Sequence, residues 1–115
     1  MSQQVAQVES GAKQRRSQRV VLTMPVLVQG GADGGQSVLE EAQTLVVNAH
    51  GALIALAMNV EVQQPLLLKN QKSLDQQPCR VVYVGPAADG KSEVGVEFTQ
   101  PAPHFWPITF PPQDW

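Results

Sequence analysis

Three closely spaced arginines are the residues of this sequence best suited to binding chemistry. Arg15, Arg16 and Arg19 lie in the run 13–19, which holds four of the eight Lys and Arg residues of the chain. A guanidinium group makes two parallel hydrogen bonds to a phosphate or to the O6 and N7 edge of a guanine, and it also stacks flat on a base. The run therefore indicates a binding site for a small anion.

The remainder of the chain is acidic, which narrows the choice of partner. Residues 20–115 carry nine Asp and Glu against four Lys and Arg, and the whole chain has a net charge of −2. The basic run is too short for the footprint of a DNA duplex, and no aromatic residue is interleaved with it, so nucleic-acid binding is not expected. Taken alone, a basic run before a strand is more often a solvated terminus, so the elements around it must decide its role.

Residues for catalysis or metal binding are sparse. His50 and His104 lie in different parts of the sequence, and no Gly-x-Ser-x-Gly, Walker or His-x-x-x-His pattern occurs. His50 sits in a turn, where it is either an ordinary polar residue or a ligand contact. The one cysteine, Cys79, lies in an apolar run and is expected to be a buried structural thiol. The sequence thus predicts a non-enzymatic protein without metal or cofactor.

The length of 115 residues predicts a single domain. Residues 1–12 are polar, rich in Gln and Ser, and are expected to be disordered. No segment is apolar enough for a signal peptide or a membrane-spanning helix, so we expect a cytoplasmic protein that does not insert into a membrane.

The body of the chain is predicted to be all-β. Short β-branched segments are separated by turn residues and cover residues 20–28, 43–47, 52–57, 65–69, 79–84 and 93–98. Pro25 marks an edge or a bend in the first of them. Residues 37–42 are expected to form at most one helical turn, and residues 85–91 a hairpin loop with an Asp-Gly signal. Six strands of this kind predict a small antiparallel barrel or sandwich.

The C-terminal segment has a different composition. Residues 98–115 hold five of the six aromatic residues and five prolines. In the simpler interpretation these rings cap one end of the barrel, so that residues 101–115 form an aromatic and proline-rich tail packed on it. In the alternative they form a docking surface for a partner protein.

Several motifs in order resemble those of PilZ domains. Arg15 and Arg19 match the Arg-x-x-x-Arg motif that opens these domains. The segment 44–54 resembles the second motif, Asp/Asn-x-Ser-x-x-Gly followed by a small residue and an apolar pair. The strands 79–84 and 93–98 resemble the later PilZ strands, the last ending in Gly-Val-Glu-Phe. The resemblance covers about residues 13–100.

This resemblance implies a six-stranded antiparallel β-barrel over residues 13–100, with the arginine-rich arm at 13–19. It also implies binding of cyclic di-GMP, often as an intercalated pair. Our hypothesis adds that the ligand orders the arginine-rich arm and that an effector protein reads this change. In the family the arginines bind guanine edges and phosphates, while the second motif adds polar contacts on the barrel surface. The implied ligand contacts are Arg15, Arg16, Arg19, Asn48, His50 and Gly51.

The second motif departs from the family pattern. If Gly51 takes the glycine position, Val46 stands at the Asp/Asn position and Asn48 at the Ser position. If instead Asn48 takes the Asp/Asn position, His50 replaces Ser and Leu53 replaces Gly. We prefer the first alignment, because residues 51–54 then match the usual strand start. The loss of a polar group at Val46 leaves an alternative function open, a divergent PilZ-like protein-interaction domain that no longer binds the nucleotide.

Overall fold

The computed structural model describes residues 18–31, 37–102, 104–108 and 110. Seven strands make up this part of the chain: β1 (Val20–Val21), β2 (Pro25–Gly31), β3 (Ser37–Asn48), β4 (Gly51–Leu56), β5 (Pro65–Asn70), β6 (Gln76–Ala88) and β7 (Lys91–Phe98). The described residues contain no helix that could cross a membrane.

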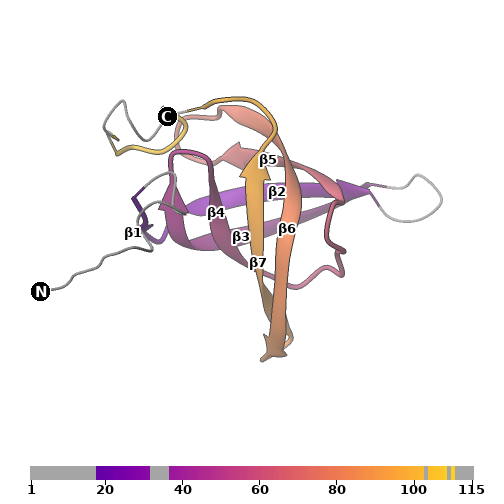
Figure 1. Cartoon of the computed structure of the whole chain (residues 1–115). Helices are drawn as coiled ribbons and strands as arrows, with labels where there is room; N and C mark the ends of the chain where they lie inside the picture. The colour runs from indigo at the N-terminus through magenta and orange to yellow at the C-terminus, as the bar shows by residue number, and fades with distance from the viewer. Residues whose placement is uncertain (1–17, 32–36, 103, 109, 111–115) are drawn as a thin grey trace, which may run out of the picture.

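Six of the strands close into an antiparallel barrel, as the resemblance implied. The order is β3-β2-β5-β6-β7-β4, and β4 pairs back with β3 to complete the ring. The short strand β1 is an addition to this ring, and it extends the line of β2 along the same edge of β3. Figure 1 shows the strands wrapping around a common interior. In the closed ring each of the six strands has a neighbour on both sides, so the sheet has no open edge. This helps to stabilise a chain whose core is small.

The barrel interior is filled by residues that alternate along the strands. Val26 and Val28 of β2, Leu68 of β5, and Val94 of β7 are fully buried. This two-residue period is typical of strands with one face toward a core. Cys79 of β6 is buried in the same core, as expected, and its burial raises the pKa of the thiol to about 12.

The first predicted strand, residues 20–28, is in fact two strands. The ladder is interrupted at residues 22–24, and the fully buried Thr44 of β3 supplies the missing hydrogen bonds. Its hydroxyl accepts a bond from the N–H of Met24 (2.9 Å) and donates one to the carbonyl of Leu22 (2.6 Å). Pro25 is therefore the first residue of a new strand, a position where its missing N–H costs nothing.

The helical turn expected at residues 37–42 is wrong. These residues are the first half of β3, a strand of 12 residues, and they pair with β2 from Ser37 opposite Gly31 to Gln43 opposite Pro25. Pairing across a sheet overrides a weak local preference, because strand propensity depends mainly on neighbours.

The loop expected at residues 85–91 is also shorter than predicted. β6 continues to Ala88 and β7 begins at Lys91, so Asp89 and Gly90 alone form the turn. Both have positive φ, 55° and 79°, as a two-residue type I′ hairpin requires. The hairpin of β6 and β7 projects beyond the barrel (Figure 1).

The segment after β7 returns to the core. Phe105 lies edge-on to Phe98, with ring centroids 5.2 Å apart, and Trp106 lies 6.1 Å from Phe98. The buried Asn70 at the end of β5 donates a 2.7 Å hydrogen bond to the carbonyl of Phe105. Phe98, Phe105, Trp106 and Phe110 are all buried, so a docking surface at these rings is wrong, whereas Trp115 lies outside the described residues.

Candidate ligand-binding site

Strand register brings four distant residues into one row on the outside of the barrel. Tyr83 of β6 pairs with Gly95 of β7, Gly95 with Leu53 of β4, and Leu53 with Val46 of β3. Their neighbours Val47, Ile54 and Val94 are buried in the core, so this outer row faces away from it. The outer row crosses four strands and forms an apolar floor.

Two β-bulges set the direction of the side chains in the outer row. One extra residue, Leu45, is inserted in β3 opposite β4, and another, Val82, in β6 opposite β7. Because successive side chains alternate, an inserted residue reverses which side chains of its strand point outward. The bulges therefore direct Val46 and Tyr83 onto the outer face.

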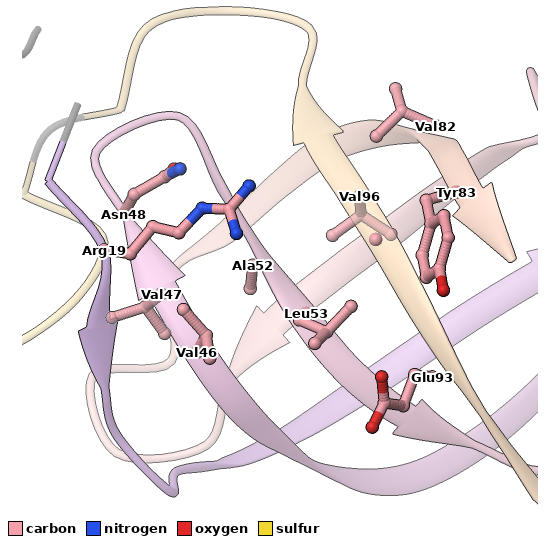
Figure 2. A pocket seen from close by; sticks show the side chains of 11 residues that line it. Arg19, Val46, Val47, Asn48, Ala52, Leu53, Val82, Tyr83, Glu93 and Val96 are labelled. Atoms are coloured by element: carbon pink, nitrogen blue, oxygen red, sulfur yellow. The ribbon is translucent and has the colours of Figure 1, made fainter. Parts of the chain in front are cut away.

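A hollow of about 450 Å³ lies over the outer row (Figure 2). It is lined by Arg19, Val46, Val47, Asn48, Ala52, Leu53, Val82, Tyr83, Glu93, Gly95 and Val96. The polar groups lie at its two ends: Arg19 and Asn48 at one, Tyr83 and Glu93 at the other (Figure 2). The middle is apolar, which is the usual composition of a small-molecule site with a few polar groups that fix orientation.

Arg19 is placed by the pairing of β1 with β3. Val20 lies opposite Val47 and Val21 opposite Val46, so continuing the register by one residue puts Arg19 beside Asn48. Val20 packs against the core, and Arg19 therefore points to the outer face. Among the described residues no carboxylate pairs with its guanidinium, which leaves the charge available to an anion.

Asn48 ends β3 and has one polar atom already in use. Its Oδ1 accepts a 2.8 Å hydrogen bond from the N–H of His50, which closes the tight turn between β3 and β4. The amide Nδ2 remains at the same end of the hollow as Arg19, where it can donate to a ligand oxygen (Figure 2).

His50 and Gly51 shape the turn and do not line the hollow. The carbonyl of His50 accepts a 2.7 Å hydrogen bond from the N–H of Phe98. A Cβ on Gly51 would collide with the carbonyl oxygen of Val96 and lie 3.0 Å from the Cα of Glu97. Glycine at this position is thus required by the close approach of β4 to β7, whatever its role toward a ligand.

The structure therefore brings together some of the ligand-binding residues expected from the sequence. It brings Arg19 and Asn48 together and places His50 and Gly51 in the adjoining turn. Arg15 and Arg16 lie outside the described residues.

Sequence reasoning missed Tyr83 and Glu93. Tyr83 is 49% exposed, and it covers Gly95, where a Cβ would lie 3.2 Å from the Cβ of Tyr83. Glu93 is the outward-facing residue before Gly95 on β7, and it pairs with Ala55 of β4. The alternation in β7 marks Glu93 as an outward residue, but only the strand order shows which other residues it meets.

An ion pair between two described residues lies on the same face of the barrel. Arg80 of β6 and Glu97 of β7 lie opposite each other, with Nη2 and Oε1 3.2 Å apart. Neither residue lines the hollow. Arg19 is thus the only cationic side chain that lines it among the described residues.

Comparison with known proteins agrees with this architecture. The structure of the Bacillus subtilis inhibitor of motility (MotI/DgrA) is similar to this chain with a TM-score of 0.60 and 14% sequence identity. The match covers 76% of this chain and 44% of that one, so this chain spans less than half of the length of that protein. No curated protein sequence matches the chain. The model of the PilZ domain matches residues 13–104, and the chain therefore belongs to the PilZ domain family.

Proposed function

We propose that this chain is a non-enzymatic signalling module that binds cyclic di-GMP on the outer face of the barrel. The observation that carries this proposal is the convergence of Arg19 and Asn48, from the two family motifs, at one end of the hollow. Cyclic di-GMP presents phosphodiester oxygens and the O6 and N7 edge of guanine, and a guanidinium binds either with paired hydrogen bonds.

The apolar floor strengthens such contacts. Val46 and Leu53 line the middle of the hollow, so a ligand bound over them is partly removed from water, and charge-assisted hydrogen bonds gain strength as the local dielectric falls. In the bound state Arg15 and Arg16 would add contacts from residues 13–19. An effector protein that contacts this segment would then distinguish the bound from the free state.

Titration calorimetry with cyclic di-GMP tests the proposal. Wild-type protein is expected to bind with micromolar or tighter affinity, and Arg19→Ala or Arg15→Ala to abolish the heat. Arg80→Ala is the matched control, because Arg80 lies on the same barrel face but outside the hollow. If wild-type protein gives no heat with an excess of cyclic di-GMP of about 100-fold, the proposal is overturned.

A protein-interaction domain without a nucleotide ligand is the second candidate. Val46 stands where the family has a polar residue, and β6 exposes three consecutive apolar side chains, Val82 (43%), Tyr83 (49%) and Val84 (39%). If this is the function, capture of a partner will be lost in Val84→Ser and retained in Arg19→Ala. Loss in Arg19→Ala, or retention in Val84→Ser, would argue against it.

A further inference from the structure

The two ends of the hollow have opposite charge, which fixes the direction of a bound nucleotide. Arg19 lies at one end and Glu93 at the other (Figure 2). A carboxylate offers only acceptors, and it repels a phosphate. Phosphate oxygens therefore belong at the Arg19 end, and a group with N–H donors belongs at the Glu93 end.

The surroundings of Glu93 favour a flat ring. Glu93 and Tyr83 border the same end of the hollow, and Leu53 lies in its apolar middle (Figure 2). Ala55 of β4 lies opposite Glu93 and has only a methyl group, which leaves room beside the carboxylate. Stacking of a base on an aromatic side chain is a common source of nucleotide affinity.

Among the purines, guanine has the donors that a carboxylate can bind in pairs. Its N1–H and N2–H₂ groups are adjacent and both donate, so the two oxygens of one carboxylate can accept from both. Adenine has an unprotonated N1 at this edge, which would face the carboxylate as a second acceptor. Two acceptors facing each other are disfavoured, because neither has a hydrogen to donate.

We propose that Glu93 is the residue that selects guanine, by accepting hydrogen bonds from N1–H and N2–H₂ of a base packed against Tyr83. The inference rests on the proposed function and adds to it a residue outside both family motifs. Glu93 has no cationic partner among the described residues, although it borders a site for an anionic ligand. A role in binding the base explains its presence there.

Three cyclic dinucleotides distinguish the hydrogen bonds that Glu93 would accept from N1–H and from N2–H₂. They are cyclic di-GMP, cyclic di-AMP, and cyclic di-inosine monophosphate, which lacks the N2 amino group. Each is titrated into wild type, Glu93→Gln and the control Glu97→Gln, a variant of the outward carboxylate two strand positions beyond Gly95. Wild type and Glu97→Gln are expected to prefer cyclic di-GMP over the inosine analogue by about tenfold or more, the effect of one charge-assisted hydrogen bond. In Glu93→Gln the affinity for cyclic di-GMP falls by a similar factor and the preference over the inosine analogue largely disappears.

The outcomes separate the two proposals. If wild type binds none of the three ligands, the proposed function fails and this inference fails with it. If wild type binds cyclic di-GMP but Glu93→Gln keeps the full preference over both analogues, the function stands and the role of Glu93 is overturned. Tyr83→Leu provides a second measurement, because loss of stacking should weaken all three ligands alike and leave the preference unchanged.

Discussion

The hydroxyl of Thr44 donates a 2.6 Å hydrogen bond to the carbonyl of Leu22, across the gap between β1 and β2. The same oxygen accepts from the N–H of Met24, so one fully buried side chain satisfies both backbone groups freed by the interruption. This contact holds β1 against β3. Because Arg19 directly precedes β1, a core residue determines where the arginine meets the hollow.

Replacement of Thr44 by valine should therefore reduce both stability and binding. The change keeps the shape of the side chain but leaves two backbone groups without their partner, at a cost of about 1–3 kcal/mol. Urea denaturation measures the loss of stability, and titration with cyclic di-GMP measures the effect on Arg19. Thr23→Val is the matched control, since Thr23 is exposed and should change stability little. Equal stability of the two variants would contradict the role assigned to the Thr44 hydroxyl.

Gly51 is predicted to be essential for the fold before any effect on a ligand. In Gly51→Ala the new Cβ meets the backbone of Val96 and Glu97, which cannot move without opening the β4–β7 pairing. The expected cost is at or above the upper end of the roughly 1–3 kcal/mol typical of overpacking. Thermal unfolding of Gly51→Ala and of Gly85→Ala makes the comparison, because a Cβ on Gly85 would come nearest the flexible end of Tyr83. A Gly51→Ala variant as stable as wild type would show that the backbone approach is not limiting.

Restoring a polar group at Val46 should strengthen nucleotide binding. Val46 lines the hollow and is only partly buried, so an amide at this position remains accessible to a ligand. Val46→Asn is expected to tighten the affinity for cyclic di-GMP by about tenfold, which corresponds to one net hydrogen bond of about 1.4 kcal/mol. Leu53→Asn is the control. It places the same amide group in the outer row, but in our preferred alignment the second motif has an apolar residue at this position. Unchanged or weaker binding by Val46→Asn would show that the departure from the motif is not what sets the affinity.

The sequence predicted the strands better than it predicted the site. Alternation in residues 93–98 and the turn around His50 were sufficient to identify β7 and the β3–β4 hairpin, because these signals are local. Arg19 and Asn48 were found through their motifs. The positions of Tyr83 and Glu93 relative to them depend on strand order and on the bulges at Leu45 and Val82. A shift of one residue in either strand would reverse the faces, and no local pattern records such a shift.

Cys79 gives a prediction about pH. Burial raises the pKa of the Cys79 thiol in the folded protein to about 12, from its ordinary value of 9.0. Below pH 9 both states are protonated and the thiol does not make stability depend on pH. Above it the unfolded chain loses the proton first, so stability falls as pH rises toward 12. Between pH 7 and 10 the loss due to this group is about 1.4 kcal/mol.

Urea denaturation of wild type and Cys79→Ala at pH 7 and pH 10 measures this loss of stability. The alanine variant is less stable at both values, because it leaves a small cavity in the core, but it lacks the thiol titration. The difference in the free energy of unfolding between the two proteins should therefore shrink by about 1.4 kcal/mol at pH 10. Reaction with a thiol reagent provides an independent measurement, since the buried, protonated thiol should react only as fast as the chain opens. A constant difference between the proteins, together with rapid modification of the folded wild type at pH 8, would show that Cys79 is accessible and ionised.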